Sequence, residues 1–159
     1  MRRMIRRAST IWAVIILTTP LASNVASQET SIKRSDLPPG VQKTADVQGK
    51  GAIVRGYTSE IENGKKQYEV QLLVKGHAKD VTIDPSGKVL EIEEQVPLEQ
   101  LSPSVKVALQ KRVGHGRILK VESLVKNGKL VAYEAQLIIN GKKSEAQVGP
   151  NGESLSHEE

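Results

Sequence analysis

The sequence predicts an α+β fold with two tandem repeats, each a helix followed by four antiparallel strands (α-β-β-β-β). We expect the repeats to dock into one domain with the helices on one sheet face. The second half matches the first at a spacing of 64 residues up to a central Asn-Gly turn and 65 beyond it. Matching residues include Leu37, Pro39, Val41, Asn63, Gly64, Tyr68, Glu69, Leu72 and Gly76, which recur as Leu101, Pro103, Val105, Asn127, Gly128, Tyr133, Glu134, Leu137 and Gly141. Because turn and apolar positions repeat while candidate catalytic groups do not, the duplication favours binding over chemistry.

Each repeat opens with a helix signal. Ser102 is a good N-cap and precedes Pro103, which suits the first helical position. Apolar residues of this segment then fall on one helix face, namely Leu101, Val105, Ala108 and Leu109. The first-repeat helix, around 38–47, has a weaker pattern with Gly40 inside it. Its better-formed copy is the main reason to expect it.

Strands follow each helix. Asn63-Gly64 and Asn127-Gly128 predict hairpins, because type I′ turns need positive φ at both central residues. Residues 68–75 and 133–140 then alternate between apolar and polar, as expected of a strand with one buried face. The inserted residue of the second copy lies just past the turn, within 130–132. Further turns predict a third strand in each repeat and a last short strand over 88–92 and 153–155.

The first 27 residues have the three-part pattern of a secretory signal peptide. Four arginines, at 2, 3, 6 and 7, precede an uncharged run over 11–21 and then small residues. The expected cleavage is after Ser27. An uncleaved anchor is the alternative, but eleven residues interrupted by Pro20 cover about half of the roughly 20 needed to span a bilayer. Arg2-Arg3 would also suit a twin-arginine exporter.

Charge and cysteine content narrow the function classes. Removing residues 1–27 takes away four arginines, so 23 basic residues fall to 19 against 18 acidic ones and the net charge drops from +5 to +1. This argues against nucleic-acid binding, which needs a concentrated positive surface. The chain has no cysteine, which excludes a lipid-bearing cysteine after the signal. We expect a bacterial protein of the periplasm or a secreted one, without stable membrane insertion after cleavage.

The repeated motifs resemble those of the PepSY-like family of exported bacterial proteins, also described as β-lactamase-inhibitor-like. The matching stretches are LPPGV, ENGKKQYEVQL and DPSGKVLEIEE in the first copy and LSPSV, KNGKLVAYEAQL and GPNGESL in the second. The resemblance implies helices on one face of an antiparallel sheet. It departs at the last turn, where Gly149 and Glu153 stand in place of Asp84 and Lys88. The expected organisation is a signal peptide (1–27), a flexible leader (28–36), the first repeat (37–94), a linker (95–100), the second repeat (101–155) and a tail (156–159).

No pattern for catalysis, a cofactor or a metal stands out. There is no cysteine nucleophile and no Gly-x-Ser-x-Gly motif, and His77, His115 and His157 lack the spacing of metal ligands. The two Gly-x-Gly pairs, at 49–51 and 114–116, lack the third glycine of a dinucleotide loop. The acid run at Glu91, Glu93 and Glu94 lacks the spaced ligands of a calcium loop and is interpreted as a solvated linker. We therefore expect a protein that is not an enzyme.

One candidate binding surface remains, on the polar face of the expected sheet. Leu73 and its copy Ile138 are aliphatic residues on that face, and Gln71 and Gln136 lie beside them. Such residues can form a partner-binding patch, or they can belong to central strands that are covered on both faces. Three further candidate anchors are Tyr57, Arg55 and Arg117.

These observations predict a non-catalytic exported protein that binds another exported protein, with inhibition or modulation of an envelope hydrolase or peptidase as the sharpest form. The chain has no Phe, and its one Trp lies in the expected signal peptide, so binding should be weak, because interface hot spots are enriched in Trp, Tyr and Arg. The alternative is a small-molecule or ion-binding protein that uses the cleft between repeats. A structural envelope protein without a discrete ligand is a third possibility.

Overall fold

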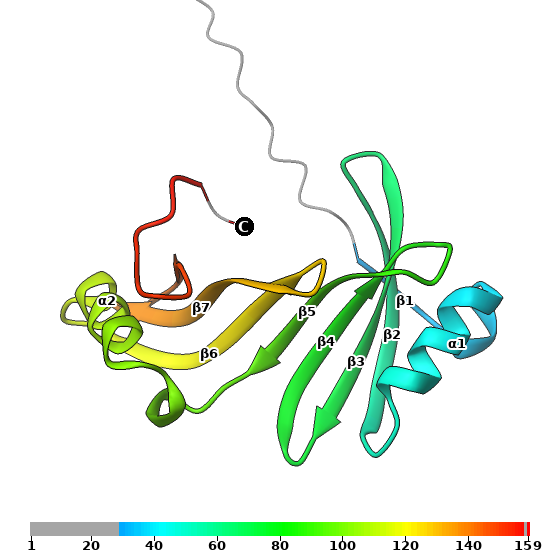
Figure 1. Ribbon diagram of the computed structural model, residues 1–159, viewed down its shortest axis with the longest axis horizontal. Helices are drawn as coiled ribbons and strands as arrows, with labels where there is room; N and C mark the ends of the chain where they lie inside the picture. The colour runs from blue at the N-terminus through cyan, green and yellow to red at the C-terminus, as the bar shows by residue number, and fades with distance from the viewer. Residues whose placement is uncertain (1–28, 158) are drawn as a thin grey trace, which may run out of the picture.

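An eight-stranded antiparallel sheet forms most of the protein, and neighbouring strands follow in chain order from β1 to β8 (Figure 1). The computed structural model describes residues 29–157 and 159, so the expected signal peptide over 1–27 lies outside the described residues. The strands are β1 Thr30–Ile32, β2 Ile53–Glu62, β3 Lys65–Val74, β4 His77–Ile83, β5 Val89–Gln95, β6 Arg117–Lys126, β7 Lys129–Ile139 and β8 Lys142–Val148. Within the described ranges, no helix is long and apolar enough to cross a membrane.

Two short helices cover the same face of the sheet, each over its own core. α1 (Pro39–Gln48) packs on β3 and β4, and α2 (Pro103–Val113) packs on β7 and β8. Ile92 of β5 packs against the first core and pairs with Val125 of β6. Val125 and Val121 are four residues apart on β6, so their side chains point to the same face of the sheet. Because Val121 belongs to the second core, both helices lie on one face. Two short 3-10 helices, η1 (Arg34–Asp36) and η2 (Leu98–Gln100), precede α1 and α2.

The predicted fold class is wrong, because the protein is not built from two docked helix-plus-sheet repeats. A single sheet runs through both halves, and β5 pairs with β6 over five residue pairs, from Glu91–Lys126 to Gln95–Glu122. Sequence alternation identifies strands but does not show which edges meet. A free strand edge has unpaired backbone N–H and C=O groups. When β5 pairs with β6, these groups of the two edges form hydrogen bonds with each other.

The two ends of the sheet also differ from expectation. Residues 153–155 form no strand, although the matching residues of the first half begin β5. β5 is held by β4 and β6, and its Val89 and Ile92 pack on the first core. The matching positions are Ser154 and His157, which offer little apolar surface. Within the segment expected as a flexible leader, residues 30–32 form β1 and pair with β2.

The turn chemistry read from the sequence is confirmed. Asn63 (φ 49°) and Gly64 (φ 75°) have the positive φ values of a type I′ turn, as do Asn127 (φ 49°) and Gly128 (φ 76°). The residue inserted in the second half is accommodated as a β-bulge. Leu124 pairs with Ala132 while the next residue, Val125, pairs with Leu130, which leaves residue 131 unpaired.

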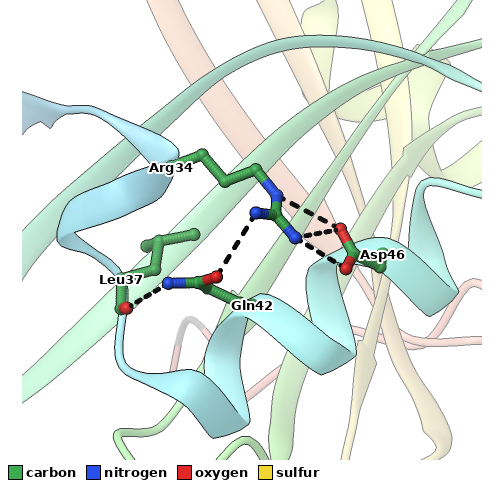
Figure 2. Close-up of polar contacts among 4 residues, drawn as sticks. All are labelled: Arg34, Leu37, Gln42 and Asp46. Atoms are coloured by element: carbon green, nitrogen blue, oxygen red, sulfur yellow. Dashed lines mark hydrogen bonds and ion pairs between the residues drawn. The ribbon is translucent and has the colours of Figure 1, made fainter.

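Polar contacts hold the segment before α1 against the helix (Figure 2). The Arg34 guanidinium donates to both carboxylate oxygens of Asp46, at 2.9 and 2.7 Å, and to Gln42 Oε1 at 3.3 Å. Gln42 Nε2 donates in turn to the Leu37 carbonyl at 2.9 Å. The hydrogen bond and charge of Asp46 raise the pKa of Arg34. Because the ion pair is exposed, its contribution is local positioning more than stability.

Candidate functional site: the acidic face of the sheet

The sheet face opposite the helices is polar and rich in carboxylates. Register pairs place Glu69 beside Thr82 and Thr82 beside Glu91, and Asp80 beside Glu93. Further along the sheet, Glu122 pairs with Glu134 and Glu134 with Gln147. We call this surface the acidic face and define it by Glu69, Asp80, Glu91, Glu93, Glu122 and Glu134. In the described part of the chain, the residues of α1 and α2 that enter the cores all pack on the other face.

Three of these carboxylates converge where the two halves of the sheet meet. Oxygens of Asp80 (β4), Glu93 (β5) and Glu122 (β6) all lie within 4.8 Å of one another. Asp80 and Glu93 are direct cross-strand partners, and Glu122 comes from the strand across the β5–β6 junction. Glu122 is only 4% exposed, and the Lys120 ammonium donates to its Oε1 at 2.7 Å. Among the described residues, Lys120 is ion-paired with one of these three acids, and the charge of Arg55 also acts on Asp80.

The environment favours the protonated form of two of these acids. Burial raises the pKa of Glu93 to about 7, and the charges of Glu91 and Glu122 add to the shift. Burial also raises the pKa of Asp80; Glu122 acts in the same direction, and Lys120 opposes it. Carboxylates this close cannot all ionise without strong repulsion. A cation or a basic side chain placed here would relieve that repulsion.

Another carboxylate with a raised pKa, Glu69, lies on β3, one strand from Asp80 and two strands from Glu93. Burial raises the pKa of Glu69 to about 7, and a hydrogen bond from Gln71 Nε2 to Glu69 Oε1, 2.9 Å long, opposes the shift. Thr58 pairs with Glu69 across β2 and β3. It is 9% exposed, and its Oγ1 has no hydrogen-bond partner among the described residues. An unsatisfied buried hydroxyl costs stability, so this part of the face is not optimised for folding.

In the structure, the binding residues expected from the sequence lie apart from one another. Leu73 and Ile138 are half-buried, and they lie on β3 and β7, four strand spacings or roughly 19 Å apart. They do not form one patch. Leu73 pairs with Ile53, which is 65% exposed, while Ile138 pairs with Arg117 and Lys143.

Of the other expected residues, Gln71 and Gln136 are half-buried on the acidic face. Arg55 is exposed at the β-bulge between Val54 and Gly56. Tyr57 packs against the first core, on the helix-covered face, so it cannot share a surface with Gln71. Partner binding by these residues stays a prediction.

The acidic cluster was missed by the sequence interpretation. Glu91, Glu93 and Glu94 were interpreted as a solvated linker, although the strand expected over 88–92 already contained Glu91. All three are half-buried residues of β5, which continues to Gln95. Their alternation with Leu90 and Ile92 was the available signal of a strand. Asp80 and Glu122 carried no such signal, because their proximity to Glu93 depends on the pairing of β5 with β6.

The junction between the halves offers little room for a small molecule. A cavity of about 160 Å³ lies there, lined by residues of 95–98 and 118–121. Pockets for drug-sized ligands are usually about 300 Å³ or larger. This cavity is therefore better suited to an ion or a side chain than to a drug-sized ligand.

Comparison with known proteins shows the fold alone. No family model matches the chain, and no curated protein matches it. A DUF2874 family protein from Bacteroides ovatus shares the fold at a TM-score of 0.60 and 20% identity, over 76% of this chain and 86% of that one. A BLIP-like protein from Bacteroides fragilis gives 0.57 and 19%, over 75% and 83%. A proposed periplasmic protein from Bacteroides eggerthii gives 0.61 and 17%, over 75% and 86%. The chain thus has the fold of these Bacteroides proteins.

Proposed function

We propose that this is a non-catalytic protein of the bacterial periplasm that binds another exported protein through the acidic face. The observation that carries this proposal is the set of half-buried carboxylates on a sheet face that neither helix covers. Carboxylates on a purely solvated surface are exposed and ionised. Glu122 is instead 4% exposed, and the pKa of Glu93 is raised. The descriptions of the Bacteroides structures as BLIP-like and periplasmic support this direction.

The chemistry of the face indicates a basic partner surface. Two carboxylates with a pKa of about 7, Glu69 and Glu93, would ionise fully beside a lysine or arginine of a partner. Charged interfaces of this kind raise association rates and select partners more than they add affinity. The most specific version of the proposal is that the protein modulates an envelope hydrolase. The scarcity of aromatic residues predicts that binding is weak.

The test starts with a cross-linked pull-down from envelope extract of the source organism, followed by affinity measurement on the purified partner. Glu93→Gln should weaken binding, and raising salt from about 50 to about 300 mM should weaken it further, because exposed charge pairs are screened. Glu99→Gln is the matched control, since Glu99 is exposed on η2 away from the face. Equal affinity of both variants at both salt concentrations would exclude the acidic face.

A divalent cation is a second candidate ligand, favoured by the convergence of Asp80, Glu93 and Glu122. Carboxylate oxygens from three strands match the ligand type that Ca²⁺ and Mg²⁺ prefer. Binding to the folded state alone would raise the melting temperature. Calcium should therefore stabilise the protein but not the Glu122→Gln variant, and equal shifts for the two proteins would discard this candidate.

A further inference from the structure

The outer edge of β8 lacks the strand that its counterpart in the first half has. After β4, the Asp84 amide donates to the Lys88 carbonyl at 2.9 Å, and the chain then continues as β5 on the edge of β4. After β8, the Gly149 amide donates to the Glu153 carbonyl at 2.8 Å, which is the same turn closure. Beyond it, residues 153–157 form no strand on β8. Leu155, Ser156 and His157 instead lie beside residues 145–147 and Arg112, and the Glu159 amide donates to Gln147 Oε1 at 2.8 Å. Residues 142–145 of β8 remain exposed.

A groove lies where the missing strand would pack. It has a volume of about 890 Å³ and is lined by residues of α2, the end of β8 and the turn after it, including Val107, Ala108, Arg112, Val148 and Asn151. Val107 is 69% exposed and lines this groove. In the first half, Val89 and Ile92 of β5 pack against the core beneath α1. The groove thus lies at the position that β5 takes in the first half, and part of its lining is apolar.

The charges around this edge suit an acidic strand. Lys111 and Arg112 of α2 are exposed, and neither forms an ion pair within residues 29–157. Lys142 and Lys143 add two positive charges to β8 itself. Lysines on an edge strand discourage pairing with a second basic edge, so another copy of β8 is a poor occupant.

The first half also shows where a carboxylate of the occupant would lie. Glu94 of β5 pairs with Lys79, whose Nζ lies 3.5 Å from Gln48 Oε1 on α1. The residues at the sequence positions that match Lys79, Gln48 and Glu94 are Ser144, Arg112 and Glu159. A carboxylate in the place of Glu94 would therefore lie beside the unpaired guanidinium of Arg112.

We propose that the β8 edge and its groove bind an extended acidic segment of a partner protein as an additional antiparallel strand. Backbone hydrogen bonds to β8 supply the affinity, and alternate side chains supply the specificity, as in other cases of strand addition. Apolar residues of the segment cover Val107 and Ala108, and a carboxylate pairs with Arg112. The segment takes the place of residues 155–157 and 159 of the chain's own tail beside β8. This site lies at the sheet edge and is separate from the acidic face.

The test uses a synthetic peptide with the sequence of residues 86–96 (SGKVLEIEEQV), which is the strand that fills this position in the first half. Titrated into ¹⁵N-labelled protein, it should shift the amide signals of residues 142–148 and 104–112. Arg112→Glu should weaken binding about tenfold, because an attraction becomes a repulsion. Lys43→Glu, an exposed charge reversal on α1, is the matched control and should bind normally.

Val107→Asp gives an independent check, because this exposed side chain can change without disturbing the core. It should also weaken binding, while Glu93→Gln on the acidic face should leave peptide affinity unchanged. The proposal is overturned if the peptide shifts only β4 and β6 signals, if a scrambled peptide binds equally well, or if neither groove variant loses affinity while its amide spectrum stays native.

Discussion

Replacing Glu69 by glutamine should remove part of the pH dependence of folding. The pKa of Glu69 is raised from 4.5 to about 7 in the folded protein, mainly by burial. Between these values the unfolded chain ionises while the folded chain keeps the proton, so stability is full below pH 4.5 and is lost as pH rises to about 7. A shift of this size corresponds to about 3 kcal/mol at about 1.4 kcal/mol per pKa unit. Because Glu69 is partly solvated, screening reduces the expected effect to about 1–2 kcal/mol.

The assay is urea unfolding followed by circular dichroism at several pH values from about 4 to about 8, which bracket the window. Glu69→Gln should match the parent near pH 4 and exceed its stability by about 1–2 kcal/mol near pH 8. The amide still accepts the hydrogen bond from Gln71, so the contact at 2.9 Å is kept. Glu99→Gln, on the exposed η2 segment, should leave the profile unchanged. A parent that is as stable as Glu69→Gln at pH 8 would refute the role of burial at this carboxyl.

Three further changes test the packing and the backbone. Thr58→Val should stabilise the protein by about 1 kcal/mol, since it removes a buried hydroxyl without a partner; a loss of stability in thermal unfolding would show that the hydroxyl is satisfied in solution. Leu109→Ala, at 0% exposure, should lower the free energy of unfolding by about 2–5 kcal/mol, whereas Val107→Ala, at 69% exposure, should lower it by less than about 1 kcal/mol. Equal urea midpoints for the two variants would contradict the burial of Leu109 in the second core. Gly152→Ala should cost about 2 kcal/mol or more, because its Cβ would lie 2.6 Å from the Ser104 carbonyl oxygen at a φ of +86°; Gly51→Ala has a φ of +78° and open space, so it measures the backbone strain alone.

The sequence by itself determined the local elements. The asparagine-glycine pairs act through residues adjacent in the chain, so the hairpins at Asn63 and Asn127 form where the sequence predicts them. Ser102 accepts from the Val105 amide and starts α2 at Pro103 for the same local reason. Apolar alternation also identified the buried residues of β3, because a side chain on a strand can face only two ways.

The tertiary structure decided which edges and faces meet. The pairing of β5 with β6 joined the two halves into one sheet and brought Asp80, Glu93 and Glu122 together. It depends on backbone groups distant in the chain, which no local pattern encodes. For the same reason, the sequence alone did not show which face Tyr57 lies on. Its packing on the first core follows from the pairing of Tyr57 with Val70 of β3. Likewise, residues 153–155 match the start of β5 in sequence but form no strand, because a strand persists only where a neighbouring edge and a core hold it.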